Sequence, residues 1–231
     1  MKKIIAQGLE FFCQIIVCLI IYSVRTFFLV CYRPKVVWTD ASVQTLRFKE
    51  PKIIIANHIS TMDPIMLLSL IFYNRNIVVA KDWYEMPKFH WILKRVKVIP
   101  CDRYNMDTEW ALLAKKELEA GRSVIIFPEG KCREDGLLNE FKSGFAFLAK
   151  STRVPVVSIG HNGVYKFGQR TTLVFGNEEI IENKKGMPSS KYLAEKSEYF
   201  RQKIWKLKLQ AEGKPFKELP IAKETPEEVL P

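Results

Sequence analysis

Short apolar runs that alternate with segments of helical periodicity constrain the fold of this chain more than any other feature of its sequence. Ile53–Asn57, Ile77–Lys81 and Ser123–Phe127 are runs of strand length, as expected for strands buried in a sheet. Further strand candidates are Val96–Pro100, Val154–Ile159, Thr171–Phe175 and a weaker run, Val43–Phe48. Strands alternating with helices favour a layered α/β fold, so we expect a central mixed, largely parallel sheet flanked by helices.

The segments between these runs have the spacing of amphipathic helices. Pro64 suits the first turn of a helix over Ile65–Tyr73, because proline lacks the N–H that a first turn leaves unused. Asp107 caps a helix that Gly121 stops. Other predicted helices are Trp83–Leu93, Gly144–Lys150 and the long basic segment Ser189–Gln210. We expect one globular domain over residues 36–212, followed by a poorly ordered tail over residues 213–231 that is rich in Pro, Lys and Glu.

The N-terminal segment, residues 1–35, is strongly apolar and predicts attachment to a membrane. Phe11 to Val24 bears no charge, and the apolar pattern resumes after Arg25. No small-residue cleavage site follows, which argues against a signal peptide. A single membrane-spanning helix and two shorter helices lying in the interface plane both fit the pattern. We favour two helices with a bend at Arg25, and a buried core helix is the remaining alternative.

The net charge indicates which partners the protein binds, and the cysteines indicate its redox environment. The net charge of +11 favours a partner with phosphate groups, such as an anionic membrane or coenzyme A. No zinc-finger or RNA-binding signature is present, so we do not expect nucleic acid as a partner. The five cysteines form no C-x-x-C pair, and we predict no metal site, no disulfide framework and exposure to reducing cytosol.

The chemically most informative residues directly follow the apolar run that ends at Asn57. His58 lies five positions before Asp63, at the end of a predicted buried strand. A carboxylate that accepts a hydrogen bond from one imidazole nitrogen makes the other nitrogen a general base. The chain has no G-x-S-x-G motif, so a substrate hydroxyl is the expected nucleophile.

This stretch, together with three later motifs, resembles the glycerolipid acyltransferase family. Asn57-His58 to Asp63 matches the first family motif, which contains the catalytic pair. Ile99-Pro100-Cys101-Asp102-Arg103 resembles the second motif, whose arginine binds the phosphate of the acyl acceptor. Phe127-Pro128-Glu129-Gly130 matches the third motif, also assigned to acceptor binding, and Val154–Ile159 matches the fourth. The resemblance covers residues 50–160.

The third motif departs from the family pattern directly after Gly130. The family usually continues Glu-Gly-Thr-Arg-Ser, whereas this chain reads Glu129-Gly130-Lys131-Cys132-Arg133. Positive charge is kept at Lys131 and Arg133, which we assign as auxiliary phosphate contacts beside Arg103. A lysine is a point charge and an arginine a bidentate fork, so the geometry around the phosphate differs from the family's.

The resemblance implies a lysophosphatidic acid acyltransferase of phospholipid biosynthesis on the cytoplasmic face of the inner membrane. It would transfer a fatty acyl chain from acyl-CoA or acyl carrier protein to the acceptor hydroxyl, without a further cofactor. The altered third motif leaves open another lysophospholipid or an amino-lipid as acceptor. A non-catalytic lipid-binding protein of the same fold is a third alternative, which the intact His58 and Asp63 disfavour.

Overall fold

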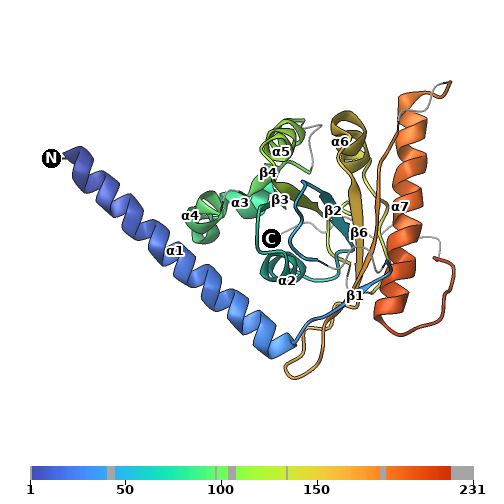
Figure 1. Ribbon diagram of the computed structural model, residues 1–231, viewed down its shortest axis with the longest axis horizontal. Coiled ribbons are helices and arrows are strands. Elements are labelled where there is room, and N and C mark those ends of the chain that lie inside the picture. The colour runs from blue at the N-terminus through green and yellow to red at the C-terminus, as the bar shows by residue number, and fades with distance from the viewer. Residues whose placement is uncertain are drawn as a thin grey trace.

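The computed structural model describes residues 2–40, 45–96, 98–103, 108–133, 135–182 and 186–219, and consists of one sheet between two layers of helices (Figure 1). The helices are α1 (Lys2–Tyr32), α2 (Asp63–Leu70), α3 (Lys81–Glu85), α4 (Pro87–Arg95), α5 (Glu109–Glu119), α6 (Gly144–Thr152) and α7 (Ser189–Ala211). The strands are β1 (Lys35–Trp38), β2 (Ile53–Ala56), β3 (Arg75–Ala80), β4 (Ile99–Cys101), β5 (Ser123–Ile126), β6 (Val156–His161) and β7 (Thr172–Glu179).

The sheet is mixed and largely parallel, as the sequence predicted. Its strand order is β1-β7-β6-β2-β5-β3-β4. The five strands from β6 to β4 run parallel to one another, whereas β7 is antiparallel to β6, and β1 pairs in parallel with β7. β2 therefore lies inside the sheet, between β6 and β5, and all four of its residues are buried.

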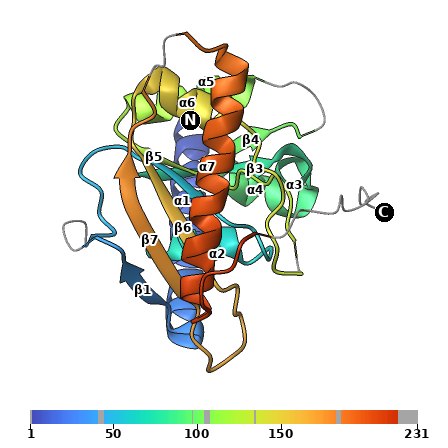
Figure 2. The ribbon, with the colours of Figure 1, turned by 90° about the vertical axis from the view of Figure 1, so that its right-hand side faces the viewer.

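Both faces of the sheet are covered by helices. Ile53 and Ile55 point into the cluster formed with α5, α6 and α7, whereas Ile54 and Ala56 point into the cluster formed with α2. This burial on both faces explains why β2 reads as an unbroken apolar run. Figures 1 and 2 show α7 on one side of the sheet and α1 on the other, where it lies outside α2.

Two predicted elements differ from the structure. The described part of the weak strand candidate Val43–Phe48, residues 45–48, forms no strand; Leu46 and Phe48 instead pack as side chains on the α2 face. The predicted helix Trp83–Leu93 is divided into α3 and α4 at Met86, whose backbone is extended. The cause is Pro87, since a residue that precedes proline avoids the helical region. Asp107, the predicted cap of α5, lies outside the described residues.

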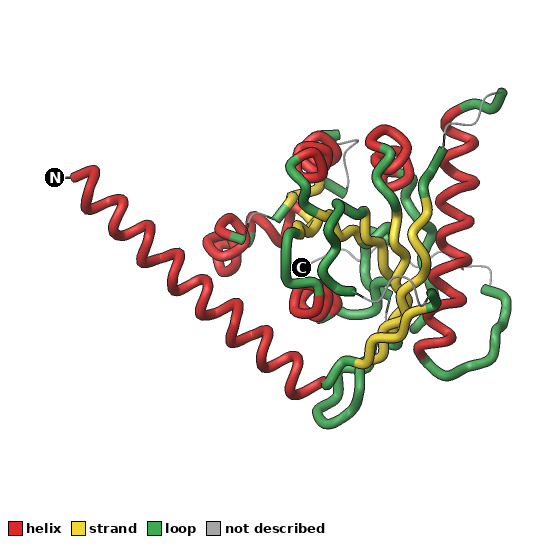
Figure 3. The backbone as a smooth tube through the Cα atoms, in the orientation of Figure 1, coloured by secondary structure: helices red, strands yellow, loops and turns green. Residues whose placement is uncertain are grey.

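α1 is one continuous helix, so the preference for two helices with a bend at Arg25 is wrong (Figure 3). The Arg25 side chain instead fastens α1 to α2, because its Nε donates to the carbonyl oxygen of Ser69 at 3.0 Å and its guanidinium lies 4.9 Å from the Phe72 ring. Nearer the N-terminus, Glu10 of α1 pairs with Arg95 of α4 at 3.2 Å. A charge in an apolar helix thus marks a docking contact here.

α1 also exposes apolar side chains along its length. Those more than half exposed are Phe11, Phe12, Leu19, Tyr22, Phe27 and Val30. The segment Glu10–Tyr32 is long and apolar enough to cross a membrane, and little of it is buried within the protein. Length and composition alone also suit a helix that lies in the interface plane.

The chain that follows α7 returns to the core as far as the structure describes it. The indole Nε1 of Trp205 donates to the carbonyl oxygen of Lys217 at 2.7 Å, and Leu219 packs against the cluster under α7. Residues 220–231, most of the predicted tail, lie outside the described residues. The predicted boundaries at residues 35 and 212 stay predictions.

The close packing at Gly160 of β6 leads us to expect that adding one methyl group there lowers the stability of the protein measurably. A Cβ there would lie 2.3 Å from the backbone nitrogen of Lys208 and 2.4 Å from the carbonyl carbon of Leu207, so α7 would have to move. We expect Gly160→Ala to lower the free energy of unfolding by about 1–3 kcal/mol, the usual cost of overpacking. Chemical denaturation measures it.

Gly176→Ala is the matched control, because Gly176 also lies under α7. The atoms nearest to its added Cβ belong to the side chains of Lys203 and Leu207, at 3.0 and 3.2 Å, and side chains can move. A loss at Gly176 equal to or larger than the loss at Gly160 would contradict this account.

Candidate active site

The predicted catalytic residue His58 and the predicted acceptor-site residue Glu129 meet at the carboxyl ends of β2 and β5. His58 follows β2 and Glu129 follows β5, and these strands are parallel neighbours in which Ile55 pairs with Ile126. A third strand, β6, also ends at this edge, and the side chain of Asn57 links the end of β2 to it. Its Nδ2 donates to the carbonyl oxygen of His161 at 3.0 Å, and its Oδ1 accepts from the His161 N–H at 2.8 Å. The ends of parallel strands are the usual place for a site in such a sheet.

Asp63, the first residue of α2, organises the turn that contains His58. Its Oδ2 accepts the backbone N–H groups of Ile59 at 2.7 Å and Ser60 at 2.8 Å, and the side chain is fully buried. Burial disfavours the charged form, but the nearby His161 and the hydrogen bonds from His58, Ser60 and Tyr165 outweigh it and hold the pKa of Asp63 below its usual value. The carboxyl group is therefore ionised at neutral pH.

His58 has the orientation of a general base. Its Nδ1 lies 2.9 Å from Oδ2 of Asp63. An ionised carboxylate only accepts hydrogen bonds, so Nδ1 holds the proton and Nε2 presents its lone pair. The Phe127 ring stacks on the imidazole with centroids 4.3 Å apart and planes 25° from parallel. The ring is thus held by a hydrogen bond at one edge and by an aromatic side chain on one face.

The thiol of Cys132 lies against the imidazole of His58. Its Sγ is 3.3 Å from Nε2 and 3.5 Å from Nδ1. A sulfur nearly equidistant from both nitrogens is aligned with neither lone pair, and in the ring plane it would overlap the carbon between them. The sulfur therefore lies over the imidazole face, opposite Phe127. This is a packing contact, since a hydrogen bond would need the donor in line with a nitrogen.

Glu129 braces the same turn from the side of β5. Its Oε1 accepts the backbone N–H of His58 at 2.7 Å, and its Oε2 accepts the N–H of Asn139 at 2.8 Å. Burial raises the pKa of Glu129 to about 7, because it outweighs those two hydrogen bonds, and the charge of Asp63 adds to the rise. Both carboxylate oxygens are thus occupied by main-chain groups. Its predicted role in acceptor binding stays a prediction.

Positive charge gathers at Gly130, the residue after Glu129. The Nη1 of Arg103 donates to the Gly130 carbonyl oxygen at 3.1 Å, and its Nη2 pairs with Asp82 at 2.8 Å. Lys142 donates to the carbonyl oxygen of Arg103 at 3.3 Å. Gly130 has a φ of 71°, a conformation that suits glycine. Lys131 is exposed next to this group. These cations suit a phosphate. The acceptor roles predicted for Arg103, Gly130 and Lys131 stay predictions, and none was predicted for Lys142.

Arg133, the other predicted phosphate contact, lies apart from this group of cations. Its guanidinium is buried and pairs with Asp135 at 2.7 Å, with a longer contact to Asn139 at 3.5 Å. Its backbone N–H donates to the His58 carbonyl oxygen at 2.9 Å. In this structure Arg133 supports the His58 turn, and its assignment to phosphate binding stays a prediction.

Two residues of the site were not predicted from the sequence. The hydroxyl of Tyr165 donates to Oδ1 of Asp63 at 2.6 Å, and burial raises its pKa well above the usual value, which keeps the proton on the donor. The second is His161, whose Nε2 lies 3.7 Å from Oδ1 of Asp63. Its Nε2 donates to the Asn57 carbonyl oxygen at 2.8 Å, and burial lowers its pKa. Both lie about a hundred residues from Asp63, so no local pattern indicates them.

The buried carboxyl of Glu129 predicts a distinctive dependence of stability on pH. A carboxyl group whose pKa is raised on folding stabilises the folded protein at any pH below the pKa that the group has in the unfolded chain. This contribution is lost as pH rises from there through about 7, the pKa of Glu129 in the folded protein. We expect wild type to lose up to ~3 kcal/mol more unfolding free energy than Glu129→Gln between pH 4.5 and 8. Denaturant titrations at both pH values measure the difference. An equal pH dependence in the two proteins would contradict this.

The chain is similar to a known protein family and to several of its members. The Acyltransferase family model matches residues 36–162. A chloroplast 1-acyl-sn-glycerol-3-phosphate acyltransferase of Brassica napus is 30% identical over 139 residues, which cover 58% of this chain and 40% of the relative. A Pseudomonas aeruginosa protein of the same name is 30% identical over 138 residues, covering 54% and 53%. The chain thus spans about two fifths to one half of the length of these relatives.

A solved structure has the same fold. The 1-acyl-sn-glycerophosphate acyltransferase PlsC from Thermotoga maritima superposes with a TM-score of 0.58 at 19% identity, over 90% of this chain and 88% of PlsC. The family model matches more than half of the chain and spans the His58–Asp63 pair and the Glu129 loop. The chain is therefore a member of the Acyltransferase family.

Proposed function

We propose that the protein transfers a fatty acyl chain from a thioester, acyl-CoA or acyl carrier protein, to the free hydroxyl of lysophosphatidic acid and so forms phosphatidic acid. The observation that supports this most directly is the His58–Asp63 pair, held by buried hydrogen bonds at the same sheet edge as Arg103 and Lys142. Similar proteins are named 1-acyl-sn-glycerol-3-phosphate acyltransferases. The reaction would take place at the cytoplasmic face of a membrane to which α1 attaches.

The proposed chemistry needs one base and no protein nucleophile. Nε2 of His58 takes the proton of the acceptor hydroxyl as its oxygen attacks the thioester carbonyl carbon. Asp63 stabilises the imidazolium that forms, as the carboxylate does in serine hydrolases. Collapse of the tetrahedral intermediate breaks the carbon–sulfur bond, and the departing thiolate receives the proton from His58. Positioning a base in this way typically contributes ~10²–10⁴ in rate.

The phosphate of the acceptor would lie near Gly130, where Arg103 and Lys142 meet. Lys131 is exposed beside them and can add charge without displacing a buried contact. This arrangement supports an acceptor with a phosphomonoester, which bears more negative charge than a phosphodiester headgroup.

A second acceptor class, another lysophospholipid or an amino-lipid, is the runner-up. It is favoured by one observation: Cys132 stands where the family usually has arginine, and the guanidinium of neighbouring Arg133 is buried against Asp135. The site therefore offers fewer guanidinium groups for bidentate hydrogen bonds to a phosphate than the family pattern does. Assaying lysolipids with different headgroups against both donor types separates the two proposals.

Removing the base should abolish acyl transfer. We expect His58→Ala to lower the rate of thiol release from acyl-CoA in the presence of lysophosphatidic acid by at least ~10²-fold. The fold should remain, because the structural hydrogen bonds of this turn come from main-chain groups. Circular dichroism checks the fold, and acyl carrier protein is tested as the second donor.

His90→Ala is the matched control, since His90 lies on α4 with its Nδ1 2.9 Å from the carbonyl oxygen of Tyr84, outside the site. This variant should keep wild-type activity. Activity of His58→Ala within tenfold of wild type would contradict the mechanism.

Cys132 distinguishes direct transfer from transfer through an acyl-enzyme. Because its sulfur lies over the imidazole face, we expect Cys132→Ser to keep activity within a few-fold. Alkylation of the thiol would fill the space beside Nε2, so iodoacetamide should inactivate wild type and spare Cys132→Ser, which keeps the other four cysteines. An inactive Cys132→Ser, together with an acyl group trapped on Cys132 of the wild type, would overturn direct transfer.

A further inference from the structure

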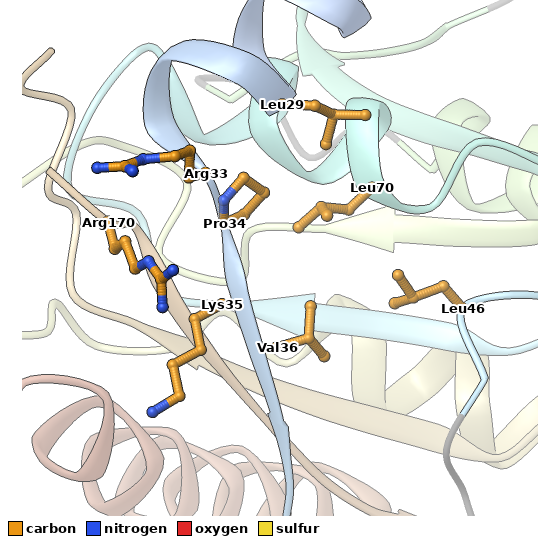
Figure 4. A pocket seen from close by; sticks show the side chains of 8 residues that line it. All are labelled: Leu29, Arg33, Pro34, Lys35, Val36, Leu46, Leu70 and Arg170. Atoms are coloured by element: carbon orange, nitrogen blue, oxygen red, sulfur yellow. The ribbon is translucent and has the colours of Figure 1, made fainter. Parts of the chain in front are cut away.

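A pocket of about 550 Å³ lies at the C-terminal end of α1, between this helix, β1, the end of α2 and the loop that joins β6 to β7. Its lining residues are Leu29, Arg33, Pro34, Lys35, Val36, Leu46, Leu70 and Arg170. Figure 4 shows the three cationic side chains along one side of the pocket and the leucines along the other. Such a division suits an amphiphile with an anionic headgroup.

The β6–β7 loop, residues 162–171, is fixed to the end of α1 at this pocket. The N–H of Gly168 donates to the Cys31 carbonyl oxygen at 3.3 Å, and the N–H of Thr171 donates to that of Tyr32 at 3.1 Å. In return, Nη2 of Arg33 donates to the Gly168 carbonyl oxygen at 2.8 Å. These bonds satisfy carbonyl groups that a helix end leaves without partners, and they place the loop beyond the end of α1 (Figure 1).

The tip of this loop exposes an aromatic side chain between cations. Phe167 is 85% exposed, the largest exposure among the large apolar residues that the structure describes. Lys166 and Arg170 are exposed on either side of it. The neighbouring end of α1 exposes Phe27 and Val30. An exposed aromatic ring flanked by lysine and arginine, continuous with an apolar helix, is the pattern of a surface that inserts into a lipid interface.

We propose that this loop and pocket are a second membrane-binding site, which takes anionic phospholipids of the bilayer. Phe167 enters the acyl region beside the end of α1. Arg33, Lys35 and Arg170 bind the headgroup phosphate, and Leu29, Leu46 and Leu70 contact the first part of the acyl chains. The proposal is independent of the acyl-transfer chemistry, since none of these side chains contacts His58 or Asp63 in the structure.

The occupant is a bilayer lipid and not a soluble phosphate ester, because half of the pocket lining is aliphatic and the loop tip is apolar. The site also lies close to the reaction centre: Tyr165, which donates to Asp63, belongs to this same loop, and its ring packs against Tyr32 of α1 with centroids 5.7 Å apart. Lipid held at the loop would therefore anchor the active-site edge of the protein to the bilayer.

Vesicle binding by the full-length protein tests the proposal. Lys166→Glu/Arg170→Glu should lower the partition coefficient on phosphatidylglycerol-containing vesicles at least ~10-fold and leave binding to pure phosphatidylcholine vesicles unchanged. Phe167→Ser should weaken binding to both vesicle types, by about 10-fold, because it removes buried apolar area. Millimolar glycerol 3-phosphate should not release the wild-type protein.

Matched variants on the opposite side of the sheet provide the controls. Lys191→Glu/Lys206→Glu makes the same charge change on α7, at two exposed lysines, and Phe216→Ser removes a phenylalanine that is 63% exposed. These variants should bind vesicles within twofold of wild type. Equal losses in test and control pairs, or wild-type binding by both test variants, would overturn the proposal. Release by glycerol 3-phosphate would identify a soluble-phosphate site instead and would equally overturn it.

Photo-crosslinking supplies a readout that does not depend on affinity or on the stability of a charge variant. With p-benzoylphenylalanine in place of Phe167, irradiation on anionic vesicles should attach lipid, whereas the same group in place of Phe216 should not. Absence of lipid attachment at position 167 in vesicle-bound protein would contradict insertion of the loop.

Discussion

Two buried carboxylates hold the turn after β2, and the rest of the site depends on this turn. Asp63 accepts the backbone N–H groups of Ile59 and Ser60, and Glu129 accepts that of His58. The carbonyl oxygen of His58 accepts from the N–H of Arg133. The main chain around the His58 ring is thus fixed from both sides. A base positioned in this way does not have to lose conformational freedom when the substrate arrives.

The two carboxyl groups lie in one buried region, and yet their pKa values are shifted in opposite directions. Asp63 has hydrogen-bond donors on both oxygens and a histidine nearby, so its charge is stabilised. Glu129 has two backbone donors, which do not offset its burial and the repulsion from Asp63, and its pKa rises to about 7. The acid that orients His58 therefore stays charged, while the acid that braces the turn is poised between its two forms near neutral pH.

The apolar helix α1 and the turn that contains His58 are joined through α2. α2 begins with Asp63, and its C-terminal half receives α1 through Ser69 and the neighbouring Phe72. At the C-terminal end of α1, the Tyr32 ring packs on Tyr165, whose hydroxyl donates a hydrogen bond to Asp63. The exposed apolar helix α1 is thus connected by two sets of contacts to the turn that contains His58.

The sequence alone determined the alternation of strands and helices, the buried strand before His58 and the order of the motifs. These features are local, because apolar runs, prolines and short spacings act over a few residues. It also indicated which residue types could perform acyl transfer. It could not show that the Glu129 side chain and the Arg133 main chain support the His58 turn, since both contacts join segments that lie far apart in the sequence.

Only the tertiary structure decided the rest. The edge strand Lys35–Trp38 pairs with β7, whereas Leu46 and Phe48 pack on the sheet as side chains and residues 45–48 pair with no strand. Arg25 suggested a bend by its charge, yet α1 is continuous there, and that charge contacts the Ser69 carbonyl oxygen of α2 and the ring of Phe72, which follows α2. Tyr165 reaches Asp63 from 102 residues away. The sequence specifies which groups need partners, and folding decides which partners they find, because burial makes an unpaired charge or hydrogen-bonding group costly.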